Sequence, residues 1–426
     1  MLLSLSLAPT LAAAGGAAWR AAPATAPTTF ITIGDWGGMA LGSYHATTTT
    51  AVAKQMAATA ADAGAAFIVN TGDNFYYCGI TSTSDKQIET DFTGPYGPYP
   101  SLSIPWYGSL GNHEYGYDVD AQIELSQTLS NWVLPARYYT KRIALGGTGQ
   151  HHLTLVVLDT SPCVAAYRSS DPSGWDPCGS DFPTCDPGSQ GPCKFHKNIL
   201  GQQCGEQFTW FKAQLAAVPK GDWLIVVGHH PADEIDIEDF GGAMEAHGFD
   251  LYLNGHVHTL TQYSINGNGA YVTSGAGAMV HTRDQQTPIA QGKLTGRYNA
   301  TVGPYNKTVA TVWNQKVAGF TLHTFSDDYT SLRTEYITYE GKVAHSFETK
   351  KGVPPSPTPP QPSTCDVGTY PCARGCTYVH KASEVACGVT SYGCYDCAKL
   401  EDGCPECKQQ MVEETSAWTS PEHASE

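Results

Sequence analysis

Short apolar runs alternate with longer amphipathic stretches through residues 28–350. The segment TTFITIGDWGG, which begins at Thr28, is an apolar run that ends at a glycine-flanked aspartate, and this pattern predicts a buried strand. The following TTTTAVAKQMAATAADAG places Val52 and Met56 one turn apart and predicts a helix with Gly64 as its C-cap. Another apolar run, AAFIVNTGDN, follows at once. Strand, helix and strand in succession indicate a right-handed βαβ unit.

The same alternation recurs further along the chain. We expect strands in HLTLVVLDT (152–160), DWLIVVGHHP (222–231) and FDLYLNGHVH (249–258), with a helix over GEQFTWFKAQLAAV (205–218). Alternating strands and helices predict an α/β fold. The chain has 426 residues, of which 41% are hydrophobic, so it can build one large α/β domain and a smaller appendage, and disorder throughout is excluded.

Polar residues gather where the predicted strands end. Ligands of open α/β sheets bind at the carboxyl ends of the strands, so these residues are compared as one group. A zinc site needs three or four protein ligands, which is fewer donors than this group offers. Two metal ions about 3.5–4 Å apart would need this larger number of donors, and a carboxylate is the natural ligand to bridge the two ions. The group consists of Asp35, Asp73, Asn74, Tyr76, Asn112, His113, His229, His230, His256 and His258.

Charge and targeting signals narrow the possible partners. The chain has 24 basic and 40 acidic residues without a basic cluster, so we expect no nucleic-acid partner. Residues 1–16, MLLSLSLAPTLAAAGG, resemble a signal peptide, and no other stretch predicts an integral membrane segment. Fourteen cysteines and the glycosylation sequons at Asn299 and Asn306 agree with an oxidising secretory route. We therefore expect a secreted or an endolysosomal or vacuolar protein.

Cysteine and proline divide the chain. A proline-rich linker, 352–364, separates the α/β domain over 28–350 from a module at 365–426 that disulfides would stabilise. Two Cys-x-x-Cys pairs in the module could instead bind zinc, but their short separation favours disulfides. Residues 161–204 form an insertion rich in Pro, Gly and Cys, which predicts a disulfide-stapled loop that either decorates the domain or rims the site.

The ordered motifs GDWGG, GDNFY, GNHE, VVGHHP and NGHVH resemble those of the purple acid phosphatases, in the small tartrate-resistant branch of the calcineurin-like metallophosphoesterase superfamily. The resemblance implies an αββα sandwich of two mixed sheets flanked by helices. It implies a ferric ion bound by an oxygen-rich set and a second, divalent ion (Fe(II), Zn or Mn) bound by a nitrogen-rich set, with a shared aspartate as the bridge. By this resemblance the first set is Asp35, Asp73, Tyr76 and His258, the second is Asn112, His229 and His256, and Asp73 is the bridge.

The family resemblance also implies a reaction, in which a metal-bound hydroxide attacks a phosphate monoester in line, with an acidic pH optimum. His113 is the expected proton donor and His230 a second candidate. An acidic residue near the site could be Glu234, Asp236 or Glu238. Alternatives are a phosphodiesterase or phosphoprotein phosphatase on the same scaffold, or a non-catalytic cysteine-rich surface-binding protein. The C-terminal module could bind a surface or polymer.

Overall fold

The computed structural model describes residues 28–39, 43–147, 149–169, 177–178, 193–280, 300–302 and 304–355, and the backbone of three short C-terminal strands. The predicted signal peptide, Asn299 and most of the C-terminal module lie outside these residues. The chain divides into two compact units, 1–357 and 358–426. In the second unit, β16 (Thr369–Pro371), β17 (Thr377–Val379) and β18 (Gly393–Tyr395) form an antiparallel sheet.

The first unit contains two mixed sheets. The first sheet has the order β15-β14-β13-β1-β2-β3-β4. Its strands β1 to β4 are parallel, and β13 joins β1 from the other side in an antiparallel register. The strands are β1 (Thr29–Ile33), β2 (Phe67–Asn70), β3 (Trp106–Gly108), β4 (Trp132–Val133), β13 (Gly319–Phe325), β14 (Ser331–Thr338) and β15 (Val343–Lys350).

The second sheet has the order β11-β12-β9-β10-β8-β7-β6-β5. Its centre, from β6 through β7 and β8 to β10, is parallel, and the strands on both sides of that centre pair antiparallel. The strands are β5 (Tyr139–Leu145), β6 (His151–Val157), β7 (Trp223–Val227), β8 (Leu251–Asn254), β9 (Leu260–Ile265), β10 (Asn268–Ser274), β11 (Ala300–Val302) and β12 (Lys307–Gln315).

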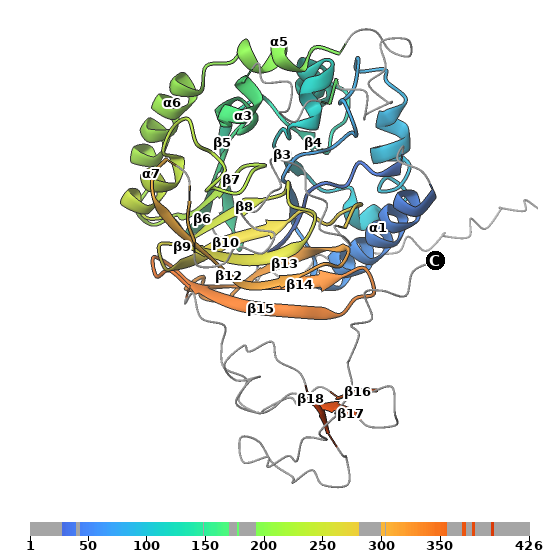
Figure 1. Ribbon diagram of the computed structural model, residues 1–426, viewed down its shortest axis with the longest axis vertical. Coiled ribbons are helices and arrows are strands. Elements are labelled where there is room, and N and C mark those ends of the chain that lie inside the picture. The colour runs from blue at the N-terminus through green and yellow to red at the C-terminus, as the bar shows by residue number, and fades with distance from the viewer. Residues whose placement is uncertain are drawn as a thin grey trace, which may run out of the picture. The chain divides into compact units, whose positions relative to one another are not determined.

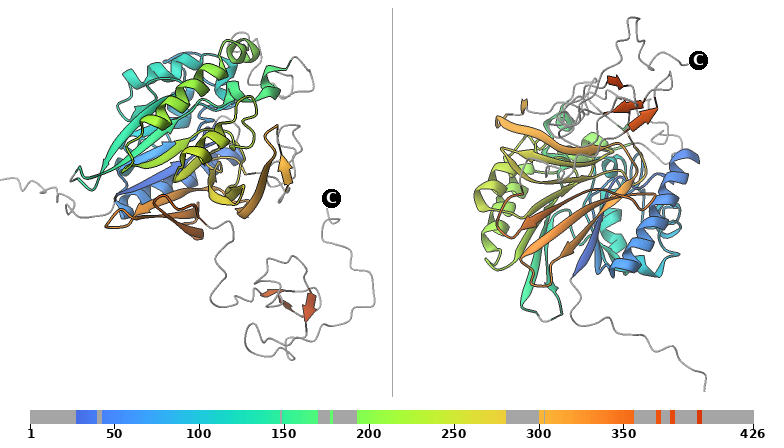
Figure 2. Two further views of the ribbon diagram at one scale, coloured as in Figure 1. Left: turned by 90° about the vertical axis from the view of Figure 1, so that its left-hand side faces the viewer. Right: turned by 90° about the horizontal axis from the view of Figure 1, so that it is seen from below.

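Helices cover the outer faces of the two sheets. Helix α1 (Ser43–Ala63) lies outside the first sheet, and α6 (Cys204–Ala217) and α7 (Phe240–His247) lie outside the second (Figures 1 and 2). Short helices carry the connections: η2 (Ile88–Thr93), η3 (Pro100–Leu102), η4 (His113–Gly116), α2 (Val119–Glu124), η5 (Leu125–Gln127), η6 (Ser161–Cys163), α3 (Ala165–Arg168) and α5 (Phe195–Leu200). The expected αββα sandwich is therefore confirmed.

The predicted β1–α1–β2 unit is present, with one difference. Helix α1 begins at Ser43, earlier than the pattern that starts at Thr47 indicates, and it ends before Gly64, whose φ is 63°. This left-handed backbone is the conformation in which glycine ends a helix without strain. Among the helices that the structure describes, none is both long enough and apolar enough to span a membrane.

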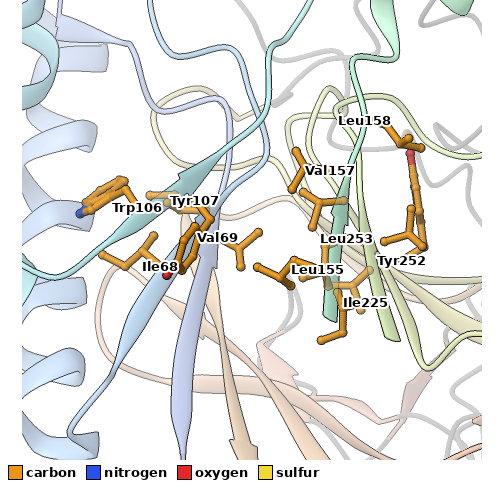
Figure 3. Packing of buried hydrophobic residues seen from close by; sticks show 14 of the residues in the cluster. Ile68, Val69, Trp106, Tyr107, Leu155, Val157, Leu158, Ile225, Tyr252 and Leu253 are labelled. Carbon is orange, nitrogen blue, oxygen red and sulfur yellow. The ribbon is translucent and has the colours of Figure 1, made fainter. Parts of the chain in front are cut away.

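The core lies between the two sheets. Because neighbouring side chains of a strand point to opposite faces, Val69 and Tyr107 of the first sheet face the second sheet, where Leu155 and Leu253 meet them (Figure 3). Ile68 points the other way, towards the helical layer. Burial on both faces explains why the central strands read as continuous apolar runs.

Candidate metal centre

Five loops that follow parallel strands bring the predicted donors together. Asp35 follows β1, Asp73 follows β2, Asn112 follows β3, His229 follows β7 and His256 follows β8. These loops come from both sheets, so the site lies at one edge of the sandwich where the carboxyl ends of the strands meet.

A glycine precedes each of these five donors, and close packing explains its presence. A Cβ atom on Gly111 would lie 2.1 Å from Asp73 Oδ1, and one on Gly255 would lie 2.3 Å from Asp35 Oδ2. Any larger residue would push the carboxylates out of place. The five glycines are Gly34, Gly72, Gly111, Gly228 and Gly255.

Three of the donors have a strained backbone. The φ angles of Asp35, Asp73 and His256 are 57°, 51° and 68°, in the left-handed region that residues other than glycine seldom occupy. Strain of this kind persists where the surrounding structure enforces it, and it is frequent at functional sites.

The first group of donors surrounds the Tyr76 hydroxyl. That oxygen lies 3.1 Å from Asp35 Oδ1, 3.2 Å from Asp73 Oδ2 and 3.1 Å from His258 Nε2. His258 Nε2 is 3.2 Å from Asp35 Oδ1. Three oxygens and one nitrogen therefore converge from four different positions in the chain.

The second group surrounds Asn112 Oδ1. His229 Nε2 lies 2.9 Å from this oxygen and His256 Nδ1 lies 3.0 Å from it. Asp73 Oδ2 is 3.3 Å from His229 Nε2, while the same oxygen contacts Tyr76 in the first group. Asp73 Oδ2 is thus shared by both groups, and the two groups consist of the seven residues predicted as metal ligands.

In the second group, acceptor atoms of His229 and Asn112 face each other. His229 Nδ1 lies 2.8 Å from the carbonyl oxygen of Thr71, which can only accept, so Nδ1 carries a hydrogen and donates it. In a neutral ring, Nε2 then points a lone pair at the Asn112 oxygen. Two lone pairs 2.9 Å apart repel each other unless a proton or a metal ion lies between them. The residues present therefore fit a metal ion.

The pKa values of the site reflect the same crowding of charge. Burial raises the pKa of Asp35 well above its usual range. Burial also raises that of Asp73, but the nearby imidazoles of His229 and His113 outweigh it and leave the pKa below its ordinary value. Burial and the two aspartates together raise the pKa of the Tyr76 phenol. A bound cation would offset the repulsion among these acidic groups.

Glu114 is a site residue that the sequence analysis missed. Its buried carboxylate accepts hydrogen bonds from the backbone N–H groups of Gly111, Asp73, Asn74 and Phe75, at 2.5–3.2 Å. It therefore ties the loop after β2 to the loop after β3 and holds Asp73 beside Asn112. The available signal was its place in the GNHE motif, directly after His113.

The two proton-donor candidates differ in their surroundings. His113 Nδ1 lies 2.6 Å from the Tyr77 carbonyl oxygen, and its Nε2 faces Asp73 Oδ2 at 3.9 Å. His230 is fully buried, and both of its ring nitrogens are within hydrogen-bond distance of hydroxyl groups, those of Thr160 and Tyr167. His113 Nε2 therefore faces the donor cluster, whereas both ring nitrogens of His230 are directed at hydroxyl groups.

The three acidic candidates also separate. Glu234 is buried, and its Oε2 lies 3.4 Å from His256 Nε2. Asp236 accepts a hydrogen bond from the backbone N–H of Ala165, and Glu238 lies beside Gly205. Glu234 is thus the one of the three that the structure places beside a predicted ligand.

The insertion contains two disulfides, Cys163–Cys204 and Cys178–Cys193, so its predicted stapling is confirmed. Asn306, the predicted glycosylation site that lies within the described residues, is exposed just before β12.

Comparisons with known proteins agree on the fold and the family. Residues 28–260 match the family model described as calcineurin-like phosphoesterase. The mouse tartrate-resistant acid phosphatase type 5 is 33% identical over 289 residues, which are 65% of this chain and 81% of the relative. Purple acid phosphatase 3 of Arabidopsis thaliana is 31% identical over 260 residues, 58% of this chain and 63% of the relative.

The fold is also similar to that of solved structures, among them GAP50. GAP50, described as the anchor in the inner membrane complex of Plasmodium, has a TM-score of 0.53 and 17% identity over 77% of this chain and 90% of its own. At this level of identity the likeness supports the fold alone.

Proposed function

The chain belongs to the calcineurin-like phosphoesterase family, and on this basis we propose that it is a secreted acid phosphatase that hydrolyses phosphate monoesters at a binuclear centre. The observation that carries the proposal is the convergence of seven donor atoms in two groups that share Asp73 Oδ2. Family membership gives the class of reaction, phosphoester hydrolysis, and the donor set supports the metal content.

The composition of the two groups supports two different metals. Asp35, Asp73 and Tyr76 would present three oxygens and His258 one nitrogen, a set suited to Fe(III). The group around Asn112, with two imidazoles, suits a divalent ion such as Fe(II), Zn or Mn. When bound, the two ions would neutralise the phosphate group and acidify the water that attacks it in line.

The residues of the chain position the reaction around these ions. His113 is oriented by the bond between its Nδ1–H and the Tyr77 carbonyl, so its Nε2 faces the cluster and would hold the proton that the leaving oxygen takes up. Glu114 keeps Asp73 and Asn112 in register, and Glu234 Oε2 lies 3.4 Å from His256 Nε2. His230 has no comparable access, so we assign proton donation to His113 alone.

Relative rates on two simple esters test the proposal. We expect the purified protein to hydrolyse p-nitrophenyl phosphate faster than bis(p-nitrophenyl) phosphate, with the maximum rate below pH 7. A faster rate on the diester would instead support a phosphodiesterase on the same scaffold. A maximum above neutrality would count against a ferric ion. Absence of hydrolysis by a protein that retains its metals would support the surface-binding alternative.

The secretory part of the proposal rests on the disulfides and on sequence signals. The Cys163–Cys204 and Cys178–Cys193 bridges persist in oxidising compartments. Exposure makes Asn306 accessible to a glycan, and Asn299 is the second expected site. A shift in mass after enzymatic deglycosylation, lost in Asn306→Gln and Asn299→Gln, would support this route into the secreted or endolysosomal space. A role of the C-terminal module in binding a surface or polymer is part of the same proposal.

A further inference from the structure

A side chain of the disulfide-stapled insertion contacts a residue next to the candidate metal centre. Tyr167, on α3, is fully buried, and its hydroxyl lies 2.9 Å from His230 Nε2. We propose that Tyr167 is a positioning residue of the centre, which orients His230 so that His230 in turn holds His256 in place for the second metal. The inference rests on the proposed binuclear centre and assigns the insertion a function within it.

Thr160 determines which nitrogen of His230 carries the hydrogen. Thr160 Oγ1 accepts the backbone N–H groups of His229 at 3.2 Å and His230 at 3.1 Å, which uses both acceptor positions of a hydroxyl. Its own hydrogen must therefore go to His230 Nδ1, 2.8 Å away. The hydrogen of the ring then lies on Nε2, and Nε2 donates to the Tyr167 oxygen.

The orientation of His230 matters because its ring packs on a predicted ligand. The centroids of the His230 and His256 rings are 4.3 Å apart, with the planes inclined by 43°. Glu234 Oε2, 3.4 Å from His256 Nε2, is a second contact of that imidazole. His256 Nδ1 is thereby directed towards Asn112 Oδ1, its fellow predicted ligand of the second metal. Replacing groups that orient a metal ligand typically costs about 10–100-fold in metal affinity.

The insertion is built to keep Tyr167 in place. The Cys163–Cys204 disulfide closes it at its base. One guanidinium nitrogen of Arg168, the next residue, lies 3.0–3.3 Å from three backbone carbonyl oxygens, those of Pro162, Ile199 and Gln202. The Tyr167 ring also packs edge-on against Phe195 of α5. The hydroxyl that meets His230 is therefore held from several directions.

A second set of contacts joins the insertion to the segment that follows Asn112. The Asn198 side chain on α5 donates to the carbonyl oxygens of Tyr115 and Tyr117, at 2.8 Å each. The backbone N–H of Lys194 donates to the Gly116 carbonyl oxygen. These partners follow directly after the GNHE motif that supplies Asn112. The insertion thus connects the loops of Asn112 and His229.

The test compares metal retention in two matched tyrosine variants. Tyr167→Phe removes the hydroxyl that accepts from His230. Tyr336→Phe removes a buried hydroxyl that donates to the Thr261 carbonyl oxygen. Each purified protein, loaded with iron and zinc, is dialysed against graded concentrations of a chelator, and both metals are quantified. We expect Tyr167→Phe to lose zinc at roughly tenfold lower chelator concentration, the lower end of the range for residues that support a ligand, while iron is retained.

A double variant shows whether Tyr167 acts through His230. If it does, Tyr167→Phe added to His230→Gln causes no further loss of zinc, whereas independent effects would add. Equal zinc retention in Tyr167→Phe and Tyr336→Phe would overturn the inference, as would full additivity in the double variant. If the unaltered protein binds no second metal, the proposed function fails and the inference with it. If the unaltered protein binds both metals and Tyr167→Phe retains zinc equally well, the inference is refuted but the proposed function is not.

Discussion

Two fully buried histidines of the same domain have opposite electrostatic surroundings. Burial lowers the pKa of both, and for His323 on β13, beside three threonine hydroxyls, the pKa falls to about 3. For His229 the carboxylates of Asp73 and Asp35 outweigh burial, and the pKa rises to about 9. The surroundings of His323 therefore disfavour a positive charge, whereas those of His229 favour one.

This difference shows what the cluster is suited to bind. Without a metal, a proton on His229 would satisfy the lone pairs that face each other across the second group of donors. A divalent ion would supply more charge, and Asn112 and His256 could hold it together with His229. Histidine burial alone does not point to a metal site; burial combined with facing carboxylate and amide oxygens supports the one proposed.

The largest expected effect comes from removing the charge that both groups share. Asp73→Asn keeps the side-chain shape, and asparagine tolerates the left-handed backbone at this position. We expect kcat/KM to fall by roughly 10³-fold or more and the metal content to drop below two ions per chain. Asp250→Asn is the matched control, because Asp250 is buried at the other end of β8. Two retained metals in Asp73→Asn would show that the cluster does not need the shared carboxylate.

Replacing His113 separates metal binding from proton transfer. In His113→Gln we expect kcat to fall by about 10²-fold or more because the leaving oxygen loses its proton donor. The metal content should stay unchanged, since His113 lies outside the predicted ligand set. Metal analysis together with steady-state kinetics checks this. Loss of metal in parallel with activity would make His113 part of the binding cluster instead.

A smaller effect is expected at Glu114. Glu114→Gln keeps an acceptor for part of the four backbone N–H groups but removes the negative charge that strengthens those bonds. We expect metal retention to weaken by roughly 10-fold, because Asp73 and Asn112 lose their common support. Chelator titration measures this change, and retention equal to that of the unaltered protein would refute the positioning role of Glu114.

The smallest expected effect is on the stability of the fold and concerns His323. The unfolded chain protonates His323 near its ordinary pKa of about 6.5, but the folded chain does so near pH 3. Between these values the unfolded state binds more protons, so stability is lost as pH falls, by about 1.4 kcal/mol per pH unit from this group. In His323→Gln the decrease should be shallower by that amount, measured by denaturant unfolding at pH 4, 5 and 6. An unchanged slope would mean that His323 is protonated in the folded protein.

Much of the fold follows from the sequence pattern, because buried parallel strands read as apolar runs that end in glycine and a polar residue. The positions of Asp35, Asp73 and His229 could be predicted on that basis. The antiparallel additions, such as β5 beside β6, have a mixed pattern with exposed residues and were not predicted from it. The neighbours of these strands depend on tertiary contacts, which the local pattern of apolar and polar residues does not determine.

The supporting residues of the site were harder to predict than the ligands. Tyr167 lies in an insertion whose composition indicates a loop, and its partner His230 is 63 residues away in the chain. Glu114 accepts hydrogen bonds from backbone N–H groups, which do not depend on residue type and therefore give no signal in the sequence. Contacts of this kind depend on the assembled loops rather than on any single motif.

The most direct test of a ferric centre is the visible absorption spectrum of the purified protein, recorded with metal analysis before and after Tyr76→Phe. The Tyr76 oxygen lies within 3.2 Å of Asp35, Asp73 and His258, so it would bind the ion in the first group. We predict about two metals per chain and a tyrosinate-to-Fe(III) charge-transfer band that disappears in Tyr76→Phe. A protein that binds no metal, or whose colour survives the substitution, would contradict this centre.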